Sequence, residues 1–425
     1  GDAAKEVLQK TMEPKILIVA TLDTKETETA YLKRHIEAHG VKTLVMDTGV
    51  LASPRELVPE VSREEVALAG GMSIDALVAT GNKGKCIDVM IKGAQSVAQK
   101  LYAEGRFTGV ISFGGAQGTN IGTAVMKNLP FGVPKLMVST VASGTATFGP
   151  FVGTKDVLMM HSVVDVQGVN SLITRVFANA AAAICGMVRN NIGQIKDGKG
   201  EKTIALSMLG TTTPGALRAK NLLEAKGYEV VAFHQNGTGG IAMEDLIREG
   251  FFHGVLDLNL HEVADRLVGG LHGSIQDYRL TAAAAAGIPQ VIAPGSIGYS
   301  VRGPVDSLSP EQKKRPYIVH NPTLTLVRLT PDEMAAVARL LATKLNKAKG
   351  PVKVLLPLKG FSFPNREGEE LWDPVGNQVF LKTFKEKIAP SIDVEEVNAH
   401  INDAEFIDRV VASFLELDLQ PTQRA

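Results

Sequence analysis

The sequence has few cysteines, no long apolar run and no excess of either charge. Its two cysteines, Cys86 and Cys185, are too few for a disulfide framework, and no second pair lies near them to complete a zinc site. No segment reaches the roughly 18 uninterrupted apolar residues of a membrane span, and residues 1–14 have no apolar signal-peptide core. We therefore expect a cytoplasmic protein in a reducing compartment, with no membrane partner.

Charge and size narrow the class of protein further. Lys and Arg together number 45, as do Asp and Glu, so no overall field favours nucleic acid as the primary ligand. A small molecule is therefore the expected partner. The chain has 425 residues, of which 44% are hydrophobic, and this size exceeds one ordinary core. We expect two subdomains.

The sequence does contain the alternation of strand and helix patterns that is typical of an α/β fold. Residues 15–22, KILIVATL, are almost wholly apolar, as in a parallel strand covered on both faces. The amphipathic segment 23–40 predicts a helix, and residues 41–50 predict a second strand. We therefore expect doubly wound, mainly parallel sheets. Further strands are expected at 107–113, 134–140, 157–164, 252–258, 290–294, 323–329 and 352–357, and further helices at 170–189, 331–347 and 402–416.

Two internal similarities predict that the halves of the chain are related by duplication. Residues 15–46 align without a gap with residues 202–233. The second alignment places GGAQGT (114–119) on GGLHGS (269–274), and GVPKLMV (132–138) on GIPQVIA (287–293). Two similarities in the same order are typical of related α/β halves.

The polar segment 190–202 separates these halves. We therefore expect two Rossmann-like subdomains, an N-terminal nucleotide-binding one over residues 1–195 and a C-terminal one over residues 196–425. Segment 295–320 is long, charged and proline-rich, which predicts a mobile excursion over a cleft or a partner.

A glycine-rich loop, FGGAQGTNIG, follows the predicted strand 107–113. Phosphate binding at the start of a helix needs backbone N–H groups that face one point and side chains small enough for oxygens to approach. The spacing matches neither a P-loop nor the dinucleotide fingerprint, so a tight turn without a ligand is the alternative. The residues expected to bind are Gly114, Gly115, Gln117, Gly118 and Thr119.

A second loop of small residues, STVASGTATFG at 139–149, follows the next predicted strand. The carboxyl ends of neighbouring parallel strands share one crevice, so this loop is expected to face the glycine loop across a ligand. Together the two loops predict a polyphosphate site. The contributing residues are expected to be Ser139, Thr140, Ser143 and Gly144.

Charged residues near other strand ends extend this predicted site. Asp23 and Thr24 come at the start of a helix, where capping is the alternative function. Lys25 lies in the first turn, where a cation opposes the helix dipole, and this position indicates an anion nearby. Lys85, in GNKGKC, is expected to add a cationic contact, with a solvated loop charge as the alternative.

At these motifs the chain resembles the ATP-binding domain at the N-terminus of the tomato mosaic virus resistance protein, which also stands alone as a bacterial and fungal family. The segments that carry the resemblance include ISFGGAQGTNIG, STVASG, AGIPQVIAPG and HNPTLTLVRLTPDE, and it runs from about residue 14 to 417. The resemblance implies two Rossmann-like subdomains, ATP in the first of them, and dimers. It places the nucleotide at Thr24, Lys25, Gly115 to Thr119, and the loop 139–144. It also implies a separate barrel-domain partner.

Candidate catalytic residues occur in both halves. His161 and Asp165 lie near a predicted strand end as base and metal ligand, or as partners in structural hydrogen bonds. In the second half Asp257 ends a strand, and His261 and Glu262 begin a helix. Their spacing is His-Glu-x-x-Asp, which does not match a zinc protease. The carboxylates are expected to hold Mg²⁺ against nucleotide phosphates or to cap the helix.

The loop 269–279 repeats the glycine motif and adds His272, Ser274 and Arg279. It is expected to bind a second anionic group, or to be a structural relic of duplication. These features together predict an ATP-binding metabolic enzyme that acts on a small anionic metabolite. Two alternatives remain: an ATP-dependent homodimeric module that binds another protein, and an enzyme of sugar phosphates or sugar acids that does not use ATP.

Overall fold

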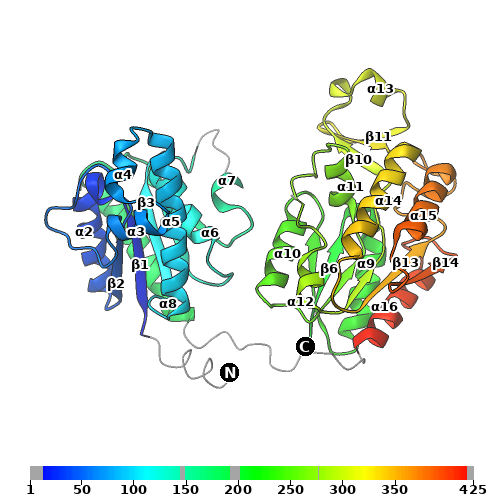
Figure 1. Cartoon of the computed structure of the whole chain (residues 1–425), viewed down its shortest axis with the longest axis horizontal. Coiled ribbons are helices and arrows are strands. Elements are labelled where there is room, and N and C mark those ends of the chain that lie inside the picture. Colours follow the sequence, from blue (N-terminus) through cyan, green and yellow to red (C-terminus); the bar gives the residue numbers. More distant parts are fainter. Residues whose placement is uncertain (1–12, 144–148, 192–201, 276, 419–425) are drawn as a thin grey trace. The chain divides into compact units, whose positions relative to one another are not determined.

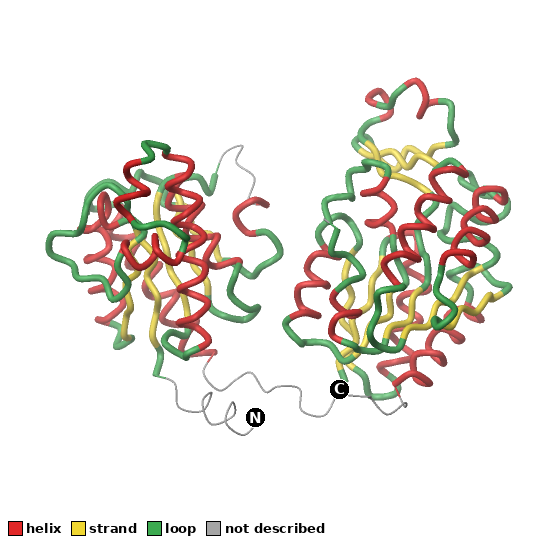
Figure 2. The backbone as a smooth tube through the Cα atoms, in the orientation of Figure 1, coloured by secondary structure: helices red, strands yellow, loops and turns green. Residues whose placement is uncertain are grey.

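The computed structural model describes residues 13–143, 149–191, 202–275 and 277–418. The chain divides into two compact units, residues 1–197 and 198–425, which we call the N unit and the C unit. Each unit is a parallel sheet with helices on both faces (Figure 1; Figure 2). The expected α/β class with two doubly wound, mainly parallel sheets is confirmed.

The N unit contains five parallel strands in the order β2-β1-β3-β4-β5. The strands are β1 (Lys15–Ala20), β2 (Lys42–Asp47), β3 (Gly109–Gly114), β4 (Lys135–Ser139) and β5 (Leu158–His161). The helices are α2 (Leu22–Ala38), α3 (Arg63–Ala69), α4 (Ile74–Ala79), α5 (Lys83–Ala103), α6 (Ala116–Lys127), α7 (Gly149–Val152) and α8 (Ile173–Asn191).

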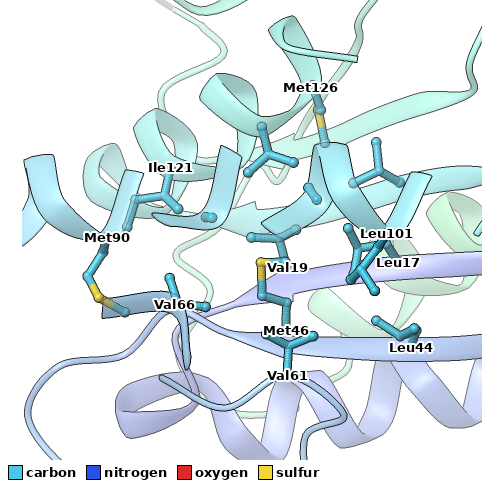
Figure 3. Packing of buried hydrophobic residues seen from close by; sticks show 14 of the residues in the cluster. Leu17, Val19, Leu44, Met46, Val61, Val66, Met90, Leu101, Ile121 and Met126 are labelled. Carbon is cyan, nitrogen blue, oxygen red and sulfur yellow. The ribbon is translucent and has the colours of Figure 1, made fainter. Parts of the chain in front are cut away.

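Side chains of the interior strand β1 alternate between two apolar cores. Leu17 and Val19 pack toward α3, α4, α5 and α6, and part of this core is shown in Figure 3. Ile16 and Ile18 point to the other face and pack against α2 and α8. Since both faces are covered, every position of the strand after Lys15 is apolar, and this is why its sequence contains a continuous hydrophobic run.

The C unit contains six parallel strands in the order β14-β13-β9-β8-β6-β7. The strands are β6 (Thr203–Met208), β7 (Glu229–His234), β8 (Gly254–Asp257), β9 (Gln290–Ile292), β13 (Val352–Pro357) and β14 (Asp393–Val397). The helices are α9 (Thr213–Glu224), α10 (Gly239–Arg248), α11 (His261–Leu267), α12 (Ala282–Ala286), α14 (Pro331–Leu345), α15 (Pro374–Lys387) and α16 (Ala404–Asp418).

Segment 295–320 differs from the expected mobile excursion. It contributes two strands to a second, antiparallel sheet of three strands, in the order β10-β12-β11. These are β10 (Tyr299–Arg302), β11 (Tyr317–Asn321) and β12 (Leu324–Arg328), with the short helix α13 (Pro310–Lys313) between β10 and β11. Strand β11 is mostly exposed, and its apolar stretch covers only residues 317–319, which is too short to predict a strand.

When only the strands of each parallel sheet are numbered along the chain, both units have the strand order 2-1-3-4-5. In the C unit, β14 adds a sixth strand at the edge. The shared order supports a common origin. Gly132 and Gly287, which the second alignment pairs, precede β4 and β9 with positive φ of 85° and 68°. The pairing of 114–119 with 269–274 is wrong, because the first loop follows strand β3 and the second follows helix α11.

Among the described residues, no helix is both long and apolar enough to cross a membrane.

Candidate functional site

The strand order of the N unit reverses between β1 and β3. Helix α2 follows β1 and packs on one face of the sheet, whereas α6 follows β3 and packs on the other. Their starts therefore diverge at the carboxyl edge of the sheet, which is the position where open α/β sheets form a ligand crevice. The sequence-predicted loops after β1, β3 and β4 all lie at this edge.

The glycine loop forms the start of α6. No side chain caps this helix at Gly115, and the first hydrogen bond that the helix itself makes joins Thr119 N to Gly115 O at 2.8 Å. The amides of Ala116, Gln117 and Gly118 therefore precede the intrahelical ladder. A Cβ built on Gly115 would have only Thr140 Oγ1 within 4 Å, at 3.7 Å, among the described neighbours. Gly115 is half-buried and Ala116 is exposed, so the described residues leave this end of the helix partly accessible.

The hydroxyls of Thr119 and Ser139 have a structural function. Both side chains are buried, and their oxygens lie 2.7 Å apart, so they tie α6 to the end of β4. Ser139 Oγ also accepts the N–H of Val141 at 3.2 Å. Thr140 is half-buried and Ser143 is exposed at the same edge. Gly144 lies outside the described residues.

His161 is brought to the glycine loop by sheet register. Gly114 of β3 pairs with Ser139 of β4, and Ser139 pairs with His161 of β5, so the three residues form one row at the carboxyl edge. His161 is half-buried there. Asp165 is exposed and makes no hydrogen bond or ion pair with the described part of the chain. His161 therefore lies at the carboxyl edge beside the glycine loop, whereas Asp165 has no partner among the described residues.

The residues after β1 are used internally. Asp23 accepts the N–H groups of Val50 and Leu51 at 2.8 and 2.9 Å, so it braces the neighbouring loop and does not cap α2. Lys25 donates to the carbonyl of Val166 at 2.5 Å and to Gln167 at 3.2 Å. These acceptors account for a cation in the first turn without an anionic ligand. Two predicted ligands, Thr24 and Lys85, are exposed near the starts of α2 and α5.

A cavity of about 730 Å³ lies beside the first turns of α2. Its lining mixes charges of both signs, including Glu26, Arg34 and Arg55. Glu26 is not free to bind a ligand there, because its carboxylate accepts the N–H groups of residues 55–57 at 2.6–3.0 Å. Sequence patterns did not predict this cavity, since the loop 51–57 that closes one side has no recognisable motif.

In the C unit, Arg279 is the centre of a buried polar cluster. Its guanidinium donates to both carboxylate oxygens of Asp257, at 2.6 and 2.7 Å. Its nitrogens lie 3.4 Å from Glu244 and 3.9 Å from Glu262. All four side chains are buried. Arg279 therefore ties the end of β8 to α10 and α11, and it is not available to bind an external anion.

Burial acts differently on the members of this cluster. It raises the pKa of Glu244 and of Glu262, and Arg279 opposes this effect without cancelling it. Burial alone would lower the pKa of Arg279, but Asp257 and the two glutamates raise it above its ordinary value. These directions agree with one ion pair, between Arg279 and Asp257, beside glutamates that hold their protons more tightly than usual.

The three catalytic candidates of the second half, Asp257, His261 and Glu262, lie together at the end of β8 and the start of α11. Glu262 does not cap α11, which begins after Leu260 without a side-chain cap. Instead its Oε1 accepts the N–H groups of Gly237 and Gly240, at 2.8 and 3.2 Å, at the start of α10. The expectation that Glu262 caps its own helix, α11, was therefore wrong, because its carboxylate binds backbone N–H groups at the start of α10.

Glu244 was missed by the sequence analysis, although a signal existed. It lies on the buried side of α10 with Gly240, Met243 and Ile247. A carboxylate on the apolar side of an amphipathic helix needs a buried partner, and Arg279 is that partner. Tyr299, whose ring lies 4.8 Å from that of His261, comes from β10 and had no comparable signal.

Comparison with known proteins identifies the family. Residues 14–192 match the N-terminal domain, and residues 201–418 the C-terminal domain, of the uncharacterised protein family UPF0261. A UPF0261 protein of Clostridium tetani is 42% identical over 397 residues and is covered to 96%, with 93% of this chain aligned. The ToMV resistance protein Tm-1 of Solanum lycopersicum is 33% identical over 426 residues, which cover 95% of this chain and 56% of the tomato protein.

Two solved structures show a distant likeness. One is the UDP-GlcNAc 2-epimerase of Methanocaldococcus jannaschii in complex with UDP-GlcNAc and UDP, with a TM-score of 0.21, 10% identity, and coverage of 66% of this chain and 83% of that chain. The other is a protein from Bacillus cereus, with a TM-score of 0.24, 11% identity, and coverage of 79% and 88%. Scores this low carry no argument about function. The matches of both domains and the relatives in bacteria and tomato show that the chain belongs to the UPF0261 family.

Proposed function

We propose that the N unit binds the phosphate groups of a nucleotide, with ATP as the first candidate, at the start of α6. The observation that carries this proposal is the helix start at Gly115, which no side chain caps and which lies where the strand order reverses between β1 and β3. An anion there would accept the amides of residues 116–118 and would interact favourably with the helix dipole.

Further contacts would come from neighbouring strand ends. His161 lies in the same row as Gly114, and Lys85 lies in the first turn of α5. In a parallel sheet, each connecting helix begins at the carboxyl edge, where the preceding strand ends, and runs back to the amino edge. Both α5, which precedes β3, and α6, which follows it, therefore begin at the carboxyl edge. Mg²⁺ would arrive bound to the nucleotide phosphates, since this ion is commonly held by phosphates and only one or two carboxylates.

The test is calorimetric titration of the full chain with ATP and Mg²⁺. Gly115→Ala places a methyl group over the amides and leaves 3.7 Å to Thr140 Oγ1, so the fold is preserved. We expect at least about tenfold weaker binding, equivalent to roughly 1.4 kcal/mol. Gly118→Val is a poorer probe, because a Cβ at Gly118 would lie only 3.1 Å from Phe113 O.

Gly186→Ala is the matched control. Gly186 lies in α8 of the same unit, and a Cβ there would meet no described atom within 4 Å. This variant should bind ATP as the wild type does. Equal affinity of wild type and Gly115→Ala would contradict the proposed site.

The consequence of nucleotide binding separates two classes of function. We propose first an enzyme that acts on a small anionic metabolite, for which steady ATP turnover with such a metabolite is expected. The name of the tomato relative, a ToMV resistance protein, favours as second candidate a homodimeric module that binds ATP and another protein without turnover. Saturation by a sugar phosphate with no response to ATP would exclude both and favour an enzyme of sugar phosphates.

A further inference from the structure

Three potential metal ligands converge in the C unit, apart from the proposed nucleotide site. His261 and Asp265 lie one turn apart on the same side of α11, and His272 lies in the loop that follows this helix. The distance from His261 Nε2 to His272 Nδ1 is 3.2 Å, and that from His261 Nε2 to Asp265 Oδ2 is 3.7 Å. Each potential ligand atom lies within 4.8 Å of the other two.

The ring of His261 is oriented for coordination. Its Nδ1 lies 3.1 Å from the carbonyl oxygen of Ser296, to which it donates a hydrogen bond. In the neutral imidazole this bond leaves Nε2 without a proton and directs its lone pair toward His272. A backbone carbonyl on the second nitrogen is the usual outer partner of a metal-binding histidine. Ser296 has a positive φ of 58°, uncommon for a residue with a side chain.

The carboxylate of Asp265 is held in place by three donors. Oδ1 accepts from Ser300 Oγ at 2.7 Å and from Val301 N at 3.1 Å, and Oδ2 accepts the backbone N–H of His272 at 2.8 Å. Strand β10 and the loop after α11 therefore fix both oxygens. The carboxylate is buried, so this position is defined by the fold and does not depend on solvent.

The same geometry explains the motif GGLHGS at 269–274. A Cβ on Gly270 would lie 1.8 Å from Asp265 Oδ1, and a Cβ on Gly273 would lie 2.6 Å from Arg266 Cα. Glycine at these two positions lets the loop wrap closely around Asp265 and bring His272 to His261. The motif therefore supports a cluster of side chains and does not form a second anion-binding helix start.

We propose that His261, Asp265 and His272 bind one first-row divalent transition-metal ion, such as Zn²⁺. Two imidazole nitrogens and one carboxylate oxygen are a ligand set of catalytic zinc and non-haem iron sites, and they leave positions for water or for an oxygen of a substrate. The separations of 3.2 and 3.7 Å from His261 Nε2 are close to those between ligands that each lie about 2.0–2.2 Å from one ion. His261 is fully buried and His272 is only half-buried, so the open positions face the side of His272.

The alternative is a direct hydrogen bond from His272 Nδ1 to His261 Nε2 without an ion. This arrangement would satisfy both rings and would need no metal. The proposal and this alternative differ in whether removing the His272 ring abolishes saturable binding of an added ion.

The experiment is calorimetric titration of the full chain, free of any histidine tag, with Zn²⁺ and then with Co²⁺. We expect one ion per chain, and Co²⁺ should give ligand-field absorption bands from bound nitrogen and oxygen. His272→Gln should weaken Zn²⁺ binding by more than about 100-fold, the upper range for losing an outer-shell partner. His320→Ala, which removes an exposed histidine of the same unit, should bind as the wild type does.

Ser300→Ala is the second variant, because it removes a donor to Asp265 but no ligand. It should weaken Zn²⁺ binding by about 10-fold and leave one ion per chain. Unfolding of the metal-free variants in urea, followed by the single tryptophan Trp372, shows whether each one folds. Wild-type affinity in His272→Gln would overturn the proposal, as would a wild type that binds no ion at saturation. These results do not depend on ATP and leave the nucleotide proposal untouched.

Discussion

The N unit and the C unit share one strand order, yet they fill the carboxyl edges of their sheets in opposite ways. In the N unit, β3 ends in glycines, and α6 begins with uncapped amides. In the C unit, β8 ends in Asp257, which binds the buried Arg279. An edge made of backbone donors can accept an anionic ligand, whereas an edge filled by an ion pair already contains its own counter-charges. The same architecture therefore leaves unpaired backbone donors at the edge of one sheet and places an ion-paired polar core at the edge of the other.

The largest effect is expected from breaking the polar core of the C unit. Arg279→Met removes the partner of Asp257 and leaves three carboxylates buried without a cation. Because an uncompensated buried charge is costly, the free energy of unfolding of the C unit should fall by about 3–5 kcal/mol. Urea unfolding monitored by Trp372 measures this unit alone, since the chain has one tryptophan.

The control for this prediction is Arg218→Met in the same unit. Arg218 pairs with Asp408 at 2.8 Å, but both side chains are exposed, and exposed ion pairs contribute little to stability. A similar loss in both variants would show that Arg279 has no special function in the fold.

The next largest effect contrasts the two glycine motifs. In the C unit, Gly270→Ala would force a Cβ to within 1.8 Å of Asp265 Oδ1, and overpacking of this kind costs about 1–3 kcal/mol. In the N unit, Gly115→Ala meets no such contact, so circular dichroism melting should hardly change. Gly210→Ala, where a Cβ meets no described atom within 4 Å, is the control in the C unit. If Gly270→Ala were as stable as Gly210→Ala, the close approach of the loop to Asp265 would be contradicted.

A smaller effect concerns pH. Burial lowers the pKa of His400 below its ordinary value of 6.5, and the neutral ring accepts from Asn402 N at 3.2 Å and bonds Ser362 O at 2.9 Å. Below pH 6.5 the unfolded chain therefore binds a proton that the folded chain does not, and stability falls as the pH decreases. His400→Gln should reduce this slope by at most about 1.4 kcal/mol per pH unit.

The measurement is urea unfolding of both proteins, monitored by Trp372, at pH values on either side of 6.5. The buried His261 and the half-buried His272 also have pKa values lowered by desolvation, so both proteins keep some slope and only the difference between them is informative. Identical slopes would mean that His400 is not held neutral in the folded state.

Much of the fold could be predicted from sequence because buried parallel strands are recognisable locally. β1 is apolar at every position after Lys15, since helices cover both faces of the sheet. Helix α14 begins with a capping box between Thr330 and Glu333, and the spacing of such a box can be read directly from sequence. Strand β11 was missed because its apolar stretch is only three residues long and the strand is mostly exposed.

The site was less predictable because its contacts join distant parts of the chain. The glycine loop could be recognised, since small residues after a buried strand are a local feature. Arg279 lies in the segment before α12, Asp257 ends β8 and Glu244 lies in α10. Their pairing depends on how these three segments pack together, which residue spacing in the sequence does not predict. Likewise, the side chains of Thr119 and Ser139, which were expected to bind phosphate, form a hydrogen bond with each other that joins α6 to β4.

The central claim is that backbone amides at the start of α6 receive the phosphates of a nucleotide. Hydrogen–deuterium exchange of the full chain, with and without ATP, tests these amides directly. If the phosphates bind there, ATP should slow hydrogen–deuterium exchange in peptides that cover residues 113–122. The exchange rate of peptides that cover residues 257–274 should change less. Slowed exchange confined to 257–274, or no change at the start of α6 when ATP is bound, would contradict it.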